Sequence, residues 1–294
     1  MSSESAQAPV LALAAALGFG AASIILRRGL AFIRPLPAAV ASVSVTTVLA
    51  SVVAAATDGL AGLVTPMIVP FLIAGFLAPG LTRLLLFVGY DRIGVSRATT
   101  LISIGPLFSI AAAMVFLGER PSGLVLVGAG LIVGGGVLLS RRAPDDRSWR
   151  RRDMIFPLLG AVGFAARDAI SRAALIAFPH PMLGAAAATL MSVSVMWLVT
   201  GVQHGRRGVT FNSAGVGLAA LSGAFEGCAY LTMWRALAIG SVSVVSPLVL
   251  AYPLVTVLLA LVFLRGVERV SWSVGVASVL TVAGVVFVML GRAG

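Results

Sequence analysis

Four ionisable residues lie inside long apolar stretches of this sequence: Arg83, Arg167, Asp168 and Glu226. An ionisable side chain inside a membrane-spanning helix is costly, so it normally faces a partner or a water-filled cavity. A carboxylate in such a place can carry a proton or balance a cationic solute. A guanidinium can hold a carboxylate or phosphate through two hydrogen bonds. We therefore take these side chains as the first candidates for solute binding or ion coupling.

Glu226 lies near the middle of an apolar stretch at 214–236. At helical spacing it shares one face with Ser222, Tyr230 and Met233. This face is small or polar where the rest of the stretch is apolar, as expected for the lining of a cavity. Glu226 is predicted either to couple protons or to balance a cationic group of a solute. The alternative is a structural ion pair with an arginine.

Arg167 and Asp168 are adjacent in the stretch 155–176. On a helix they point about 100° apart, so they are not expected to serve one small site. Asp168 and Arg172 are four residues apart and are predicted to pair on one face. Arg167 is then left without a local partner, which makes it a candidate for binding a carboxylate or phosphate.

Three prolines, Pro106, Pro247 and Pro253, lie inside apolar stretches, where each removes one backbone hydrogen bond. In a transporter such kinks line a cavity or act as hinges, whereas a static bundle simply tolerates them. Tyr230 and Tyr252 are candidate solute contacts, and a helix-packing role is the alternative for Tyr252.

The composition predicts that these residues belong to an all-α polytopic membrane protein. Hydrophobic residues make up 59% of the chain and charged residues 11%, whereas charged residues are roughly a quarter of a soluble protein. Apolar runs of about 20 residues recur, which is the length that crosses a hydrocarbon layer roughly 30 Å thick. Backbone groups inside such a layer must be paired, and the alternation of barrel strands is missing, so the runs predict helices.

Several chemistries are disfavoured by the residues that are rare or missing. The sequence has no lysine, which argues against a P-loop nucleotide site and Schiff-base chemistry. Cys228 is the single cysteine, and His180 and His204 have no metal-ligand spacing, so neither metal nor cofactor is expected. The net charge of +11 comes from arginines that lie mostly between apolar runs, where they contact lipid head groups rather than nucleic acid. The N-terminus lacks the basic region of a signal peptide, so the first run is expected to remain as a helix.

Ten membrane-spanning segments are predicted, at 10–26, 38–57, 66–88, 98–117, 123–139, 155–176, 182–201, 214–236, 242–264 and 274–290. A basic linker at 141–153 separates a first unit, 1–140, from a second unit, 154–294. The units resemble each other, and the matching residues occur in the same order. Gly18-Phe19 corresponds to Gly163-Phe164, and Glu119-Arg120 corresponds to Glu268-Arg269. Between them, Ile93-Gly94 followed by Pro106 corresponds to Ile239-Gly240 followed by Pro253. Five segments is an odd number, so the second unit must enter the membrane inverted. Inverted repeats are typical of secondary transporters that bind solute between the copies.

The repeat relates Arg83 to Glu226. Gly80 corresponds to Glu226 in the alignment, so Arg83 lies about one helical turn from the symmetric position. Arg83 and Glu226 are predicted to meet across the pseudo-two-fold axis, either as a gate opened by an ionic substrate or as a fixed brace. The alternative is that Arg83 extends to the membrane surface. Separately, Gly130 and Gly134 have the spacing of a helix-packing face, within one subunit or between two, and a monomer and a homodimer stay open.

Most arginines fall in the odd-numbered connections, at 27, 28, 34, 92, 97, 206, 207, 265 and 269 and at six positions of the linker. The even-numbered connections and the C-terminal tail hold only Arg120, Arg172, Arg235 and Arg292. By the positive-inside rule the odd connections are cytoplasmic and both termini face outward.

The sequence resembles the EamA-type repeat of the ten-helix branch of the drug/metabolite transporter superfamily. The resemblance is carried by Ile93-Gly94-Val95-Ser96, Pro106, Phe116-Leu117-Gly118-Glu119-Arg120 and the glycines at 128, 130 and 134. The second copy is similar from Arg235-Ala236-Leu237 through Pro247 and Pro253 to Glu268, although Arg265-Gly266-Val267 interrupts its Gly-Glu junction. The resemblance implies an exporter of amino acids, metabolites or toxic compounds, with segments three, four, eight and nine around a cavity. It also implies cytoplasmic termini, against the arginine count, so the orientation stays open.

The sequence therefore predicts a multi-pass protein of the cell inner membrane that moves a small metabolite, amino acid or organic ion by secondary active transport. Efflux by alternating access is expected, with a proton as an optional coupling ion, and no enzyme activity. One alternative is a non-transporting subunit or receptor. Another is a membrane-embedded lipid-processing enzyme, which would need clustered acids or a His-Asp pair. The acids are scattered, and both histidines lie in predicted loops without nearby acidic partners.

Overall fold

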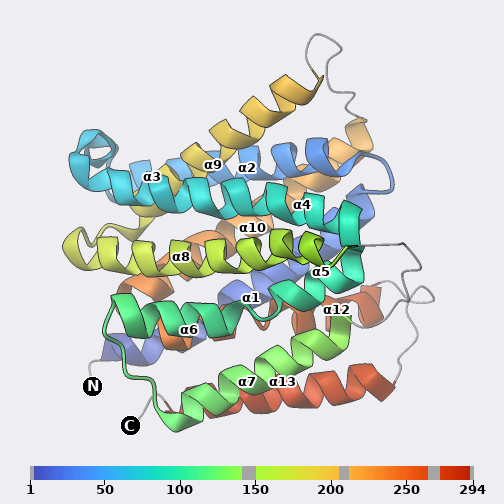
Figure 1. Ribbon diagram of the computed structural model, residues 1–294. Coiled ribbons are helices and arrows are strands. Elements are labelled where there is room, and N and C mark those ends of the chain that lie inside the picture. The colour runs from blue at the N-terminus through green and yellow to red at the C-terminus, as the bar shows by residue number, and fades with distance from the viewer. Residues whose placement is uncertain (1–2, 141–149, 205–211, 264–271, 292–294) are drawn as a thin grey trace.

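The protein is described from a computed structural model that covers residues 3–140, 150–204, 212–263 and 272–291. Within these residues the chain is helical and contains no strand. In these ranges, ten helical stretches are long and apolar enough to cross a membrane. They form a bundle whose chain ends lie together at one end (Figure 1). The predicted all-α polytopic fold is confirmed.

The first unit supplies five of these spans. The first two are α1 (Ser3–Gly29) and α2 (Pro35–Thr57). After the short turn η1 (Ala61–Val64), the third span runs through η2 (Pro66–Ile68), α3 (Val69–Gly75), η3 (Phe76–Leu81) and α4 (Thr82–Ile93). The fourth span consists of α5 (Val95–Ile102) and α6 (Gly105–Phe116), and the fifth is α7 (Gly123–Ser140).

The second unit repeats this order. The turn η4 (Arg151–Met154) leads into α8 (Ile155–Ala177), which is followed by α9 (Pro181–His204) and α10 (Ser213–Ile239). The ninth span consists of α11 (Val242–Val249) and α12 (Tyr252–Phe263), and the tenth is α13 (Trp272–Gly291). Most of the linker and the predicted positions Arg206, Arg207, Arg265, Glu268, Arg269 and Arg292 lie outside the described residues.

Both units break their fourth helix at the same place. In the first unit α5 ends at Ile102 and α6 starts at Gly105, with Pro106 in its first turn. In the second unit α11 ends at Val249 and α12 starts at Tyr252, followed by Pro253. The expectation that Pro106 and Pro253 kink continuous helices is therefore corrected, because a proline in the first helical turn gives up no intrahelical hydrogen bond. Pro247 does lie inside a helix, α11.

The two units are interlocked rather than side by side. The first helix of each unit packs against the third span of the other, because α1 runs along α10 and α8 runs along α3 and α4. The fifth spans, α7 and α13, pack against each other and lie next to one another at one side of the bundle (Figure 1). Any space enclosed by the bundle is therefore bounded by helices of both units.

Glycines allow α7 and α13 to approach closely, but Gly130 and Gly134, which the spacing predicted for a packing face within one subunit or between two, take no part in this contact within the chain. A Cβ atom at Gly128 would lie 2.6 Å from the carbonyl oxygen of Gly284, and one at Gly284 would lie 2.6 Å from that of Gly128. Gly130 and Gly134 have nothing within 4 Å of such an atom. Because residues two apart on a helix face different directions, Gly128 belongs to the contact face within the chain, whereas Gly130 and Gly134 do not.

Replacing Gly128 with alanine should lower the thermal unfolding midpoint of the purified protein in detergent. The added methyl group would meet backbone atoms of α13, and overpacking of this kind costs about 1–3 kcal/mol. Gly130→Ala is the matched control on the same helix, and it should leave the midpoint unchanged or raise it slightly, since alanine favours helix over glycine by about 0.5–1 kcal/mol. Equal losses in the two variants would contradict the assignment of the packing face.

Candidate functional site

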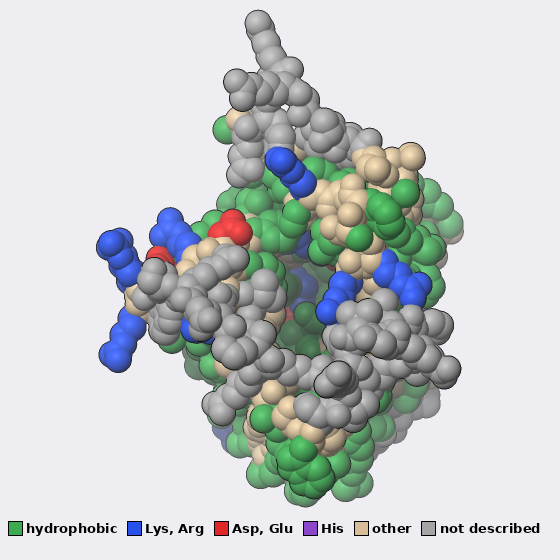
Figure 2. Space-filling view, turned by 90° about the vertical axis from the view of Figure 1, so that its right-hand side faces the viewer, with side chains coloured by type: hydrophobic (Ala, Val, Ile, Leu, Met, Phe, Trp, Pro, Cys, Tyr) green, Lys and Arg blue, Asp and Glu red, His purple; other side chains and the backbone are tan. Residues whose placement is uncertain are grey.

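A cavity of about 470 Å³ lies in the centre of the bundle, a size typical of small-molecule sites. It is lined by residues of the first, third and fourth spans and of the sixth, eighth and ninth, which are the corresponding spans of the two units, together with the last turn of α7. The space-filling view shows a hollow between arginine side chains on the face away from the chain ends (Figure 2). The family resemblance implied that the third, fourth, eighth and ninth spans surround a cavity, and in the structure the first and sixth spans line it as well.

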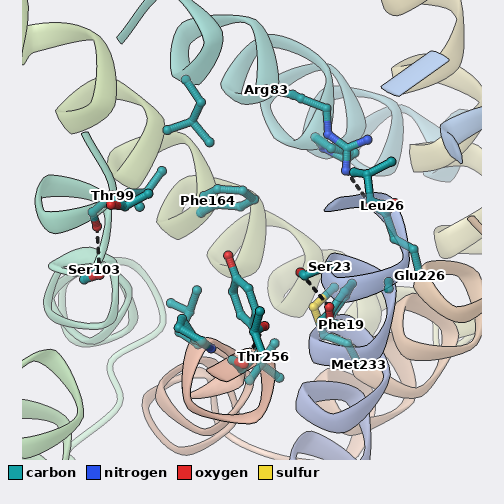
Figure 3. Close-up of a pocket in the computed structure, with 18 of the residues that line it drawn as sticks. Phe19, Ser23, Leu26, Arg83, Thr99, Ser103, Phe164, Glu226, Met233 and Thr256 are labelled. Carbon is teal, nitrogen blue, oxygen red and sulfur yellow. Dashed lines mark hydrogen bonds and ion pairs between the residues drawn. The ribbon is translucent and has the colours of Figure 1, made fainter. Parts of the chain in front are cut away.

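An ion pair between Arg83 and Glu226 lies in the cavity wall. Arg83 comes from α4 in the first unit and donates through Nη2 to Glu226 Oε1 on α10 in the second unit. Figure 3 shows the two side chains meeting near Leu26. Their side chains are 21% and 14% exposed, so both are mostly removed from water. The structure thus brings together the two residues that the sequence symmetry related.

The remaining hydrogen-bonding groups of this pair are unequally satisfied. Glu226 Oε2 accepts a hydrogen bond of 2.8 Å from Ser42 Oγ on α2. Arg83 Nη1 is buried and has no hydrogen-bond partner among the described residues. An unpaired buried donor is unfavourable, and a charged one more so. One nitrogen of the guanidinium, Nη1, therefore has no bond, while each oxygen of the carboxylate is already engaged.

A second charged pair, Arg167 with Asp168, is buried, and Arg167 lines the cavity. Arg167 Nε and Nη2 donate to Asp168 Oδ1 over 2.9 and 2.6 Å. Ser246 Oγ on α11 donates to Asp168 Oδ2 over 2.5 Å. Arg167 lines the cavity but is only 7% exposed. It lies over the ring of Phe164, with 5.2 Å between its Cζ and the ring centroid.

The predictions for this segment were wrong in two respects. Arg167 has a partner, because its long side chain folds back onto the neighbouring carboxylate although the two Cα–Cβ bonds diverge. Arg172 does not pair with Asp168; its Nη1 donates instead to the carbonyl oxygens of Leu237 and Ala238 at the end of α10. Asp168 therefore neutralises Arg167, and two of the three guanidinium nitrogens are occupied.

The remaining wall is apolar and aromatic, with hydroxyl oxygens between the rings. Phe19 and Tyr252 contact each other with their ring centroids 6.3 Å apart. The hydroxyls of Ser23, Ser103 and Thr256 each donate to a carbonyl four residues earlier in their own helix. Figure 3 shows Phe19, Ser23, Ser103 and Thr256 around the open space. Because their protons are used within the helices, these hydroxyls can offer acceptor oxygens to a solute, whereas the arginines can offer donors.

Seven of the eight predicted site residues line the cavity: Arg83, Pro106, Arg167, Glu226, Tyr230, Tyr252 and Pro253. Pro247 does not, because it is buried within α11. Sequence reasoning did not select Ser42 and Ser246, which donate to the two carboxylates, or Tyr90, which lines the cavity. It also did not select Phe19 and Phe164, although the repeated Gly-Phe pair was a usable signal: both phenylalanines line the cavity from equivalent positions of the two units.

The end of the bundle away from the cavity mouth holds one further correction. His180 Nδ1 lies 3.1 Å from Asp58 Oδ1, so this histidine does have an acidic partner. Asp58 follows α2 and His180 precedes α9, and the helices bring together residues that are far apart in sequence. Neither lines the cavity. In the part of the chain that the structure describes, no group of three or more His, Cys, Asp or Glu side chains could hold a metal ion.

Comparisons with known proteins agree with this architecture. The sequence matches the EamA-like transporter family twice, over residues 7–141 and over 152–290. A solved crystal structure, titled only as that of a protein, is similar with a TM-score of 0.81 and 18% sequence identity, covering 98% of this chain and 98% of that chain. A search of curated protein sequences found no match. The structural likeness at this identity supports the fold.

Removing the charge of Asp168 should destabilise the protein. In Asp168→Asn, Arg167 would remain buried without a counter-charge, and breaking a buried ion pair in this way costs about 3–5 kcal/mol. The thermal unfolding midpoint in detergent should fall clearly. The double variant Arg167→Met with Asp168→Asn removes both charges and should recover much of the loss. An unchanged midpoint in the single variant, or a larger fall in the double variant, would contradict this description of the pair.

Proposed function

The chain belongs to the EamA-like transporter family of the drug/metabolite transporter superfamily, and we propose that it is a secondary active transporter for a small metabolite, amino acid or organic ion. It works by alternating access between its two inverted units, in the efflux direction, in the inner membrane of the cell. The efflux direction and the membrane rest on the family resemblance. The partners of the protein are the lipid bilayer and the solute, with a proton as an optional coupling ion.

The observation that carries this proposal is the Arg83–Glu226 pair in the wall of a central cavity. One charge comes from each unit, so relative movement of the units changes the distance between them. A solute ion that enters the cavity competes with one partner for the other. Inverted repeats with a site near the midplane are the usual architecture for exchanging access between two sides of a membrane.

The cavity chemistry favours a zwitterion or an organic ion over a neutral sugar. The Arg83 guanidinium, which lines the cavity, can donate to an anionic group, and Glu226 can balance a cationic group or take up a proton. Aromatic rings from both units, including Phe19 and Phe164, offer apolar surface to the rest of the solute. This arrangement supports a small amphipathic solute that carries at least one charge.

Enzyme activity is the less well supported alternative to transport. The His180–Asp58 pair is an arrangement that membrane-embedded enzymes can use. Neither residue lines the cavity, however, and the ring of His180 packs against Phe178 with 4.6 Å between the ring centroids. The pair therefore joins the ends of two helices outside the cavity, and the charged groups of the cavity itself are arranged as two neutralised pairs.

The proposal is tested by flux measurements in proteoliposomes with labelled amino acids and organic ions, with and without an imposed pH gradient. In Glu226→Gln, flux should fall by about tenfold or more, a change that corresponds to about 1.4 kcal/mol of lost interaction. Loss of the gradient dependence as well would identify Glu226 as the coupling residue.

Cys228→Ser is the matched control for this experiment. Cys228 lies two residues away on the same helix and is exposed on the outside of the bundle, so flux should not change. Full flux in Glu226→Gln would keep the transporter and remove Glu226 from its essential residues. Absence of flux for every solute with the wild-type protein would count against transport.

A further inference from the structure

The joint between α10 and α11 lies at the end of the bundle away from the cavity mouth, and it is tightly packed. Ala236, Leu237 and Val242 are at most 1% exposed, and Ser243 is 3% exposed. A Cβ atom at Gly240 would lie 2.5 Å from Cβ of Ala8 on α1, so the joint is pressed against the first helix. Here the second unit turns from its eighth span to its ninth, and the cavity does not reach it.

Glu119 of the first unit caps the start of α11. Its Oε1 accepts a hydrogen bond of 2.8 Å from the backbone N–H of Val242, and its Oε2 accepts one of 2.9 Å from that of Ser243. The N-cap residue itself, Ser241, makes no side-chain capping bond. A helix start leaves N–H groups unpaired and carries partial positive charge, so a carboxylate satisfies both requirements. The cap of a second-unit helix thus comes from the first unit.

The position of Glu119 is set by the turn that ends α6. Gly118 has a positive φ of 65°, a conformation that favours glycine. The backbone N–H of Glu119 then donates to the carbonyl of Ala113 over 3.1 Å. The carboxylate therefore extends from a turn fixed by its own backbone, and its reach to α11 depends on the relative position of the two units.

Arg172 binds the other side of the same joint. Its Nη1 donates to the carbonyl oxygens of Leu237 and Ala238, over 2.9 and 2.6 Å, at the end of α10. A cation is favourable at the carbonyl end of a helix for the same electrostatic reason that an anion is favourable at the N–H end. The joint is therefore held between an acid and a base, one on each helix end. Bonds between charged side chains and backbone groups are also stronger than neutral ones.

We infer that Glu119 is a latch between the units that keeps the end of the bundle near the termini closed while the cavity is open at the other end. Arg172, which belongs to the second unit like the joint itself, holds the joint in the position that Glu119 caps. The inference rests on the proposed alternating access. Opening this end requires the α10–α11 joint to leave Glu119, because the carboxylate belongs to the first unit and the joint to the second. Weakening the latch should therefore shift the protein toward a state with the opposite opening, without altering the cavity residues.

The test uses thiol labelling in the Cys228→Ser background, which has no other cysteine. Ser23→Cys reports on the cavity, and Val245→Cys reports on the closed end, where Val245 is 0% exposed. A membrane-impermeant maleimide is applied from each side to intact cells and inverted vesicles. With the latch intact, Ser23→Cys should react and Val245→Cys should not.

In Glu119→Gln, an NH2 group that cannot accept replaces one of the two carboxylate oxygens, and the negative charge at the helix start is lost. We expect Val245→Cys labelling from the side of the termini to rise about tenfold, and Ser23→Cys labelling from the opposite side to fall, a shift that corresponds to about 1.4 kcal/mol. Arg172→Gln should likewise raise the labelling of Val245→Cys and lower that of Ser23→Cys. Arg120→Gln is the matched control, because Arg120 is the exposed neighbour of Glu119 and its loss should change neither reporter.

Reciprocal changes support the latch, because unfolding would raise the labelling of both reporters together. Unchanged labelling in a monodisperse Glu119→Gln protein, or a joint rise of both reporters, would overturn it. Labelling needs no solute, so the outcome is separate from the flux measurements. Reciprocal labelling without flux would count against the proposed solutes while supporting the latch. Flux with unchanged labelling would support transport of those solutes and overturn the latch.

Discussion

Charges placed inside an apolar helical bundle have to be neutralised by one another, and this requirement organises the centre of the protein. Arg83 on α4 and Glu226 on α10 meet from opposite units, and Ser42 on α2 satisfies the second carboxylate oxygen. Arg167 and Asp168 form the other pair, with Ser246 as the additional donor. Each pair takes its hydroxyl from a different helix, so the charges also set how neighbouring helices are placed.

The broken helices give this charged centre its space. Both units interrupt their fourth helix after Ile102 and after Val249, and a proline in the first turn starts the next segment. The cavity is lined on both sides of these breaks, by Ser103 and Pro106 in one unit and by Leu250 and Pro253 in the other. A continuous helix at either position would present a regular face of side chains, whereas a break leaves room for a solute.

The two ends of the bundle differ although the units are related. At the end near the termini, Glu119 and Arg172 hold the α10–α11 joint, and His180 contacts Asp58. At the other end, Arg92 donates to Asp153 over 3.0 Å and lies over the ring of Phe156, so the end of α4 is joined to η4 and to the start of α8. Glu119 and the Asp58–His180 contact join the two units at one end, and Arg92 joins α4 of the first unit to the start of the second unit at the other. Alternating access would have to break and remake contacts of this kind.

The sequence by itself determined the membrane-spanning character, the ten spans and the internal repeat, because hydrophobic length and an odd number of spans per unit leave few alternatives. It also pointed to Arg83 and Glu226, since repeat symmetry relates positions in different helices. Periodicity describes a residue only relative to its own helix. It therefore did not reveal that Arg167 folds onto Asp168, that Gly128 rather than Gly130 meets α13, or that Asp58 reaches His180. Only the tertiary structure decided these contacts, because each depends on which neighbouring helix lies opposite or on the reach of a long side chain.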